Sequence, residues 1–213
     1  MIHWVCFDVG ETIFDETGLW SRWATYLGVE PGAFRAALSN VIAQGRHHRE
    51  VFEHFRPGFD INTAMAERLA AGDDPGLRSD DIFPDVRPAC AALVAAGIKI
   101  GVAGNTSVMT EHAVHALGLP VAFVASSSRF RIDKPAPGFF QTLADACSAP
   151  PADIAYVGDR IDNDAMPAEQ AGMMGIWLRR GLWADVQRAS PQATSVPHQI
   201  ASLTELLSLL RPK

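Results

Sequence analysis

Short apolar segments alternate with amphipathic helical segments from about residue 84 to the end of the chain. The apolar segments are continuous runs, as in strands that are buried on both faces. Strands and helices that follow each other at these short intervals are typical of a parallel sheet with helices on both sides. We therefore predict an α/β fold with a doubly wound parallel sheet. The expected strands are 2–7, 98–103, 121–125, 154–157 and 175–178, and the expected helices are 84–96, 108–117, 137–147, 165–171 and 203–210.

A segment of different character follows the first expected strand. Between residues 17 and 79, apolar residues recur at helical spacing, as in Leu19, Trp23 and Tyr26, and Pro-Gly pairs separate the helical stretches. This pattern predicts an all-helical unit that is inserted into the α/β core. We expect the core to comprise residues 1–15 and 81–213 and the helical unit to comprise residues 16–80.

The charge balance limits the classes of partner. The chain has 18 basic and 24 acidic residues and a net charge of −6, which argues against nucleic acid or an anionic membrane as the main partner. It has no apolar run long enough to span a membrane, and its first residues lack the basic region of a signal peptide. Cys6, Cys90 and Cys147 lack metal-ligand spacing and are expected to be buried thiols. We expect a soluble, cytoplasmic protein whose partner is a small molecule.

Polar residues follow the expected strands at the points where the strands end. Asp8 follows the first strand, Asn105 follows the second, and Asp159 and Asp164 follow the fourth. Lys134 lies in the loop between the third strand and the helix expected at 137–147. The carboxyl ends of parallel strands meet at one edge of a sheet, so we expect these side chains to lie together. Several carboxylates with one lysine suit a divalent cation and an anionic ligand, and Mg²⁺ prefers such oxygen ligands.

At this point the sequence resembles the haloacid dehalogenase superfamily, from Ile2 to about Gly181. The resemblance implies a Rossmann-like core, and the helical insertion occupies the place of that family's C1 cap, which closes over the site and sets substrate choice. Four motifs match in order: Phe7-Asp8-Val9-Gly10-Glu11-Thr12, Gly101-Val102-Ala103-Gly104-Asn105, Lys134-Pro135-x-Pro137 and Gly158-Asp159-x4-Asp164.

The resemblance implies a phosphatase chemistry with assigned roles. Asp8 would be the nucleophile and form an aspartyl-phosphate that water hydrolyses. Lys134 would pair with Asp8 and with the transferring oxygens. The implied Mg²⁺ ligands are Asp8, the Gly10 carbonyl, Asp159 first and Asp164 second, and Asn105 would lend an amide donor to the phosphate. Gly104 and Thr106 beside Asn105, and Arg160 beside Asp159, are further candidate phosphate contacts, although Arg160 could equally form a surface ion pair.

Two positions depart from the family pattern. Family phosphatases carry a second Asp two residues after the nucleophile, as the general acid for the leaving alcohol, and this chain has Gly10 there. Positioned proton transfer contributes roughly 10²–10⁴-fold to rate. Glu11 could replace the acid. Gly104 stands where the family has Ser or Thr, and Thr106 or Ser107 could supply that hydroxyl.

These departures leave several functions open. The first is a Mg²⁺-dependent phosphohydrolase of a small phosphorylated molecule, slow because the acid is missing. The second is carbon–phosphorus hydrolysis, which needs a cap lysine, and residues 17–79 contain none. The third is 2-haloacid dehalogenation, which dispenses with the metal, whereas Gly158-Asp159-x4-Asp164 keeps the acidic motif. The fourth is a catalytically weak relative that binds a metal and an anion and serves in regulation.

Overall fold

The structure is a computed structural model that describes residues 1–211. Lys213, one of the three lysines, lies outside the described residues. The chain divides into two compact units. One unit contains Met1–Asp15 and the described residues from Ile82 onward, and the other contains Glu16–Asp81.

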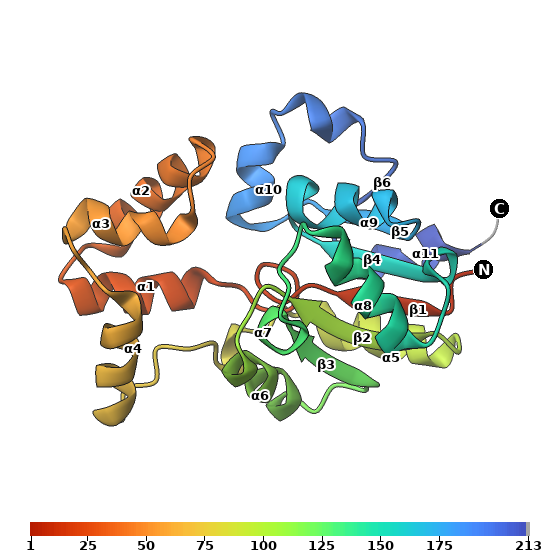
Figure 1. Ribbon diagram of the computed structural model, residues 1–213, viewed down its shortest axis with the longest axis horizontal. Helices are drawn as coiled ribbons and strands as arrows, with labels where there is room; N and C mark the ends of the chain where they lie inside the picture. Colours follow the sequence, from red (N-terminus) through yellow and green to blue (C-terminus); the bar gives the residue numbers. More distant parts are fainter. Residues whose placement is uncertain (212–213) are drawn as a thin grey trace. The chain divides into compact units, whose positions relative to one another are not determined.

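The first unit is built on a six-stranded parallel sheet in the order β3-β2-β1-β4-β5-β6 (Figure 1). The predicted α/β fold with a parallel sheet is therefore confirmed. Strand β6 was not predicted, because its three residues include His and Gln and give no apolar run. The strands are β1 (Trp4–Phe7), β2 (Lys99–Gly104), β3 (Phe123–Ser126), β4 (Ile154–Gly158), β5 (Met174–Leu178) and β6 (His198–Ile200).

The central position of β1 explains its composition. All four of its residues are buried, because β2 and β4 flank it and helices cover the sheet. Phe7 pairs with Val102 on β2 and with Val157 on β4. The residues that follow these three strands therefore share one edge of the sheet.

Helices lie on both faces of this sheet. The right-handed crossover rule places α5 and α6 on one face and α8 and α9 on the other, and α11 packs against α5 while α8 packs against α9. On α8, Phe139, Phe140 and Leu143 are fully buried and join the core that includes Tyr156. The helices are α5 (Val86–Ala95), α6 (Val108–Ala116), α7 (Ser127–Phe130), α8 (Pro137–Cys147), α9 (Met166–Gln170), α10 (Gly181–Gln187) and α11 (Leu206–Leu210).

Four of the helical elements differ from the predicted ones. Helix α9 is preceded by a π-helical turn, Ile161–Ala165, and α11 is preceded by a 3₁₀ turn, Leu203–Glu205. Neither α7 nor α10 was predicted, since each is short and begins within three residues of a strand end. Helices this short depend on tertiary packing more than on local helix propensity.

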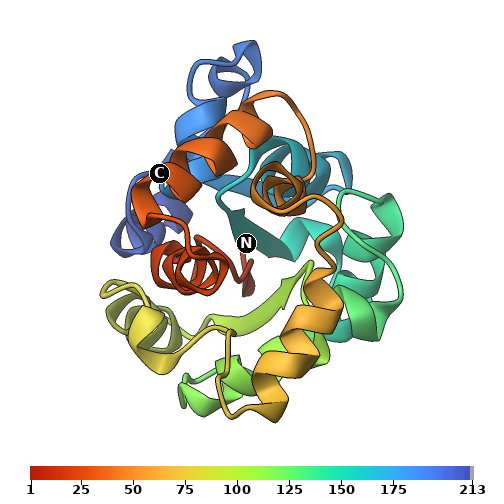
Figure 2. The ribbon, with the colours of Figure 1, turned by 90° about the vertical axis from the view of Figure 1, so that its left-hand side faces the viewer.

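The second unit contains four α-helices: α1 (Thr17–Leu27), α2 (Pro31–Ala43), α3 (Val51–Phe55) and α4 (Ile61–Ala70). It also contains two 3₁₀ turns, His48–Glu50 and Ser79–Asp81. Figure 2 shows the four helices from a second direction, coloured from red through orange to yellow-orange. An aromatic cluster forms their core, in which the Trp23 and Phe52 rings meet edge to face at 5.3 Å. Gly28 ends α1 in the left-handed conformation, with φ 71°.

The described chain also settles the state of the cysteines. Cys6, Cys90 and Cys147 are buried free thiols, as predicted. Burial raises the pKa of Cys90 to about 11, so this thiol is unreactive at neutral pH. None of the helices in residues 1–211 combines the length and apolarity that a membrane crossing requires.

Candidate active site

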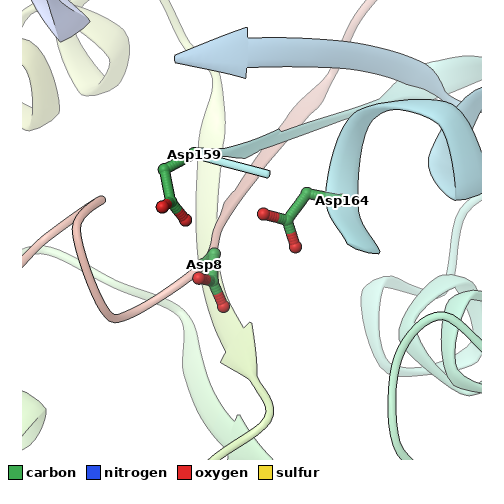
Figure 3. A group of neighbouring side chains, drawn as sticks. All are labelled: Asp8, Asp159 and Asp164. Carbon is green, nitrogen blue, oxygen red and sulfur yellow. The ribbon is translucent and has the colours of Figure 1, made fainter. Parts of the chain in front are cut away.

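Three carboxylates meet at the edge of the sheet where β1 and β4 end. Asp8 follows β1, and its backbone N–H donates to the Val157 carbonyl at 2.8 Å. Asp159 follows β4, and the π-helical turn then returns Asp164 to the same place. Each of the three offers an oxygen within 4.8 Å of the other two, and Figure 3 shows the carboxylates of Asp159 and Asp164 facing the space beside Asp8.

Lys134 bridges two of these carboxylates. Its Nζ donates to Asp8 Oδ1 at 2.7 Å and to Asp164 Oδ1 at 2.5 Å. The lysine side chain is 1% exposed and that of Asp164 is fully buried. The second oxygen of Asp164 accepts from the Arg160 backbone N–H at 2.9 Å. Buried charges persist when they are paired in this way, so the three side chains form one unit.

The burial of this unit shifts its protonation equilibria. Burial on its own would lower the pKa of Lys134, but the charges of Asp164 and Asp8 outweigh it and hold the pKa well above the ordinary value. Burial raises the pKa of Asp164 to about 6, although Lys134 opposes the shift and Asp8 adds to it. Lys134 is therefore a permanent cation at neutral pH.

Aromatic rings lie beneath the Lys134 ammonium. The ring centroids of Tyr156 and Phe139 are 5.2 and 5.9 Å from Nζ. The Tyr156 hydroxyl donates to the Ala103 carbonyl at 2.7 Å, which fixes the ring between β4 and β2. These contacts favour the charged form of the lysine. We did not predict Tyr156 as a site residue; the signal was a tyrosine within an otherwise apolar, buried strand.

Asn105 holds the backbone of Lys134. Its Nδ2 donates to the Lys134 carbonyl at 2.8 Å, and its Oδ1 accepts from the Lys134 N–H at 2.7 Å. Asn105, which we predicted as a phosphate contact, therefore fixes the backbone of Lys134 and with it the point from which the lysine side chain extends. Both bonds join segments that are 29 residues apart in the sequence.

Two glycines make room for the carboxylates. A Cβ on Gly104 would lie 2.4 Å from Asp8 Oδ1, and one on Gly158 would lie 2.2 Å from Asp164 Oδ2. Real Cβ atoms do not approach other atoms this closely, so a side chain at either position requires the carboxylate to move. Gly104 thus lets Asp8 occupy the space beside the end of β2.

Arg160, Thr106 and Ser107, which we also considered for phosphate binding or for a replacement hydroxyl, form contacts with other residues of the protein. The Arg160 guanidinium makes a two-pronged pair with Asp162, with Nη2 2.6 Å from Oδ2, and stacks 3.8 Å above the Trp183 ring. The Thr106 carbonyl accepts from the Ser128 hydroxyl at 3.1 Å. The Ser107 hydroxyl caps α6 by accepting from Thr110 N–H. Of the two proposed replacement hydroxyls, Ser107 is therefore committed to the helix.

Gly10 and Glu11 lie in the turn that follows Asp8. Glu11 has the left-handed φ of 50°, and its side chain is buried. A Cβ on Gly181 would lie 2.5 Å from Glu11 Oε2 and 2.6 Å from Glu11 Cβ. The Glu11 side chain therefore packs directly on the backbone of the first residue of α10.

The donor set suits a hard divalent cation. Carboxylate oxygens are the ligands that Mg²⁺ prefers, and two or three of them suffice because Mg²⁺ retains several waters. Both oxygens of Asp164 already accept a hydrogen bond, one from Lys134 and the other from the Arg160 N–H, so Asp8 and Asp159 are the better placed pair for a metal.

Comparisons with known proteins give the chain its context. A family model described as haloacid dehalogenase-like hydrolase matches residues 2–172. A glyceraldehyde 3-phosphate phosphatase from Methanopyrus kandleri is 29% identical over an alignment 235 residues long, which covers 99% of this chain and 98% of the relative.

Solved structures share the fold. A phosphatase of the haloacid dehalogenase type from Thermococcus onnurineus has a TM-score of 0.64 and 19% identity, with 98% of each chain covered. An L-2-haloacid dehalogenase from Xanthobacter autotrophicus has a TM-score of 0.70 and 18% identity, with 99% of each chain covered. At these identities the likeness shows the fold alone, and it spans both phosphatases and dehalogenases.

Proposed function

The chain belongs to the haloacid dehalogenase-like hydrolases, and we propose that it is a Mg²⁺-dependent phosphohydrolase that acts on a small phosphorylated molecule through Asp8. The name of the Methanopyrus relative supports this substrate class, since that protein is a phosphatase of a phosphorylated three-carbon sugar. Specificity for one such molecule is a separate matter, because the identity between the two chains is 29%.

The observation that carries the proposal is the Asp8–Lys134 pair beside Asp159. Lys134 Nζ lies 2.7 Å from Asp8 Oδ1 and binds the attacking carboxylate through a charge-assisted hydrogen bond. The same ammonium can balance the negative charge of the transferring oxygens. Asp159 is buried and shares the metal-binding group with Asp8.

Mg²⁺, when bound, would offset the repulsion between the Asp8 carboxylate and the phosphoryl oxygens. Asp8, the Gly10 carbonyl and Asp159 would hold it, with Asp164 as the second acidic ligand. The donor set of carboxylates around Asp8 fits this ion.

The reaction divides into two displacements on phosphorus. A carboxylate oxygen of Asp8 forms a bond to phosphorus as the bond between phosphorus and the leaving oxygen breaks, and the leaving group takes the bonding electron pair. Water then attacks the phosphorus of the aspartyl-phosphate and loses a proton to solvent. The bond between phosphorus and Asp8 breaks, which releases phosphate and restores the carboxylate.

The residue at position 10 restricts the leaving group. Gly10 has no side chain to give a proton, and the neighbouring Glu11 packs on Gly181. We therefore propose that the enzyme acts best on esters whose leaving group is stable as an anion, and that it is slow on simple alkyl phosphates.

The absence of an acid at Gly10 also favours a second candidate function. A protein that keeps the lysine and the acidic group but lacks the acid would bind Mg²⁺ and an anion and turn over poorly. Two further alternatives have less support. The three clustered carboxylates argue against metal-free dehalogenation, and the lack of lysine between residues 17 and 79 argues against a Schiff-base route.

A hydrolysis assay with Mg²⁺ separates the two main candidates. Acyl and aryl phosphates are offered to the wild-type protein, to Asp8→Asn and to Asp145→Asn, which changes an exposed carboxylate on α8. The phosphohydrolase predicts turnover that is lost in Asp8→Asn and kept in Asp145→Asn. Mg²⁺ binding without turnover that depends on Asp8 would identify the binding protein instead.

A further inference from the structure

Arg180 binds the turn that follows the proposed nucleophile. It lies between β5 and α10, and its Nε donates to the Glu11 carbonyl at 3.2 Å. Nη2 donates to the carbonyl of Thr12, the next residue. One guanidinium therefore holds two consecutive carbonyls of a turn that is about 170 residues away in the sequence.

Asp85 and Phe83 bind the Arg180 guanidinium as well. Nη1 lies 2.8 and 2.9 Å from the two oxygens of Asp85, and the guanidinium carbon lies 3.8 Å above the Phe83 ring. Asp85 Oδ2 also accepts from the Ser202 hydroxyl at 2.8 Å and from the Leu203 N–H at 2.9 Å. Although burial would raise the pKa of Asp85, these partners outweigh it and keep the pKa below the ordinary value.

The turn itself needs an external hold. Glu11 has a φ of 50°, in the left-handed region that is unfavourable for a residue with a side chain. Its side chain packs on Gly181, the residue next to Arg180. Arg180 and Gly181 therefore contact both the carbonyl and the side chain of Glu11, and together they fix the backbone directly after Gly10.

We propose that Arg180 is a positioning residue for the metal site: it fixes the turn at Glu11 and Thr12 and thereby sets how well the Gly10 carbonyl and Asp8 bind Mg²⁺. The inference rests on the proposed function for the identity of the metal. It assigns Arg180 no contact with substrate, because its donors are directed to carbonyls and to Asp85.

The geometry requires arginine rather than any cation. A planar fork reaches the two carbonyls and the carboxylate at once, whereas the compact ammonium of lysine cannot span them. Residues that orient metal ligands typically affect metal affinity by about 10–100-fold when they are replaced. A residue that merely stabilises the fold would lower the unfolding temperature without changing the affinity of the folded protein.

The test is titration calorimetry with Mg²⁺ on the full chain, with thermal unfolding of the metal-free protein as the control for folding. Arg180→Met and Arg180→Lys are compared with Arg179→Met, which changes the exposed neighbouring arginine. We expect Arg180→Met to weaken Mg²⁺ binding by at least about tenfold and Arg180→Lys to recover little of it. Arg179→Met should bind like the wild type. Aryl phosphate turnover, if limited in this way, should rise toward the wild-type value at saturating Mg²⁺, with an unchanged KM for the ester.

The outcomes separate this inference from the proposed function. A folded Arg180→Met that binds Mg²⁺ within twofold of the wild type overturns the positioning role, whatever the turnover. Weakened Mg²⁺ binding in a protein without turnover dependent on Asp8 supports the positioning role and refutes the hydrolase. If Arg180→Met does not fold, the comparison rests on Arg180→Lys, for which wild-type affinity is again the contradicting result.

Discussion

Gly104 and Asp8 are so close that a Cβ on Gly104 would lie 2.4 Å from Asp8 Oδ1, the oxygen that binds Lys134. The end of β2 therefore decides which orientation the Asp8 carboxylate can take.

Gly104→Ser should impair turnover more than stability. The added Cβ forces Asp8 to rotate away from the 2.7 Å bond with Lys134, and small misplacements of a reacting group cost on the order of 10²-fold in rate. The measurement is kcat on an aryl phosphate. Gly97→Ser is unsuitable as a control, because Gly97 has a φ of 77° and a side chain there would strain the backbone. Ser107→Ala, at the nearby helix cap, is the better comparison and should keep most of the activity. Full activity in Gly104→Ser would mean that the Asp8 orientation seen here is not the reactive one.

Lys134→Met should cost both stability and activity. Removing one partner from a buried charged group leaves Asp8 and Asp164 facing each other, which typically costs about 3–5 kcal/mol. Urea unfolding measures the loss, and Lys99→Met provides the matched control because Lys99 is exposed at the start of β2. Equal unfolding midpoints for the two variants would contradict the paired arrangement.

Gly10→Asp should change the dependence of rate on the leaving group. A carboxylic acid at position 10 could give its proton to a departing alcohol, so alkyl phosphates should gain up to about 10²-fold while aryl phosphates change little. Gly10→Asn has a side chain of the same size without the acidic proton and should give no such gain. A uniform effect of Gly10→Asp on all esters would argue against a missing general acid.

The stability of the metal-free protein should depend on pH through Asp164. Its pKa is raised in the folded state from 3.8 to about 6. Its contribution to stability is therefore complete below pH 3.8 and is lost as the pH rises through 6. Between these limits the loss is on the order of 3 kcal/mol, and Asp164→Asn should remove this dependence. Free energies of unfolding at pH 4, 5, 6 and 7 test it, and parallel curves for the two proteins would be the contrary result.

The fold could be predicted because its signals are local in the sequence. Continuous apolar runs identified five of the six strands, and polar residues at strand ends indicated where Asp8, Asp159 and Asp164 would lie. The roles given to these residues in catalysis stay predictions.

The partners within the site could not be predicted in the same way. Asn105 uses its amide on the Lys134 backbone, and Glu11 packs on Gly181, because segments far apart in the sequence meet there. Arg180 also escaped prediction, although it follows a strand end like the residues that we singled out. Arg180 stands two residues after the end of β5, so the same argument from polar residues at strand ends would have indicated it.

The most direct measurement for Asp8 as nucleophile is a search for the phosphorylated carboxylate during turnover. Enzyme that is hydrolysing an aryl phosphate with Mg²⁺ is quenched in acid, and its peptides are mapped by mass spectrometry. We predict a phosphoryl group on the peptide that contains Asp8, and its absence, together with all turnover, in Asp8→Asn. Hydrolysis at the wild-type rate by Asp8→Asn, with no phosphoryl group on that peptide in either protein, would contradict the mechanism.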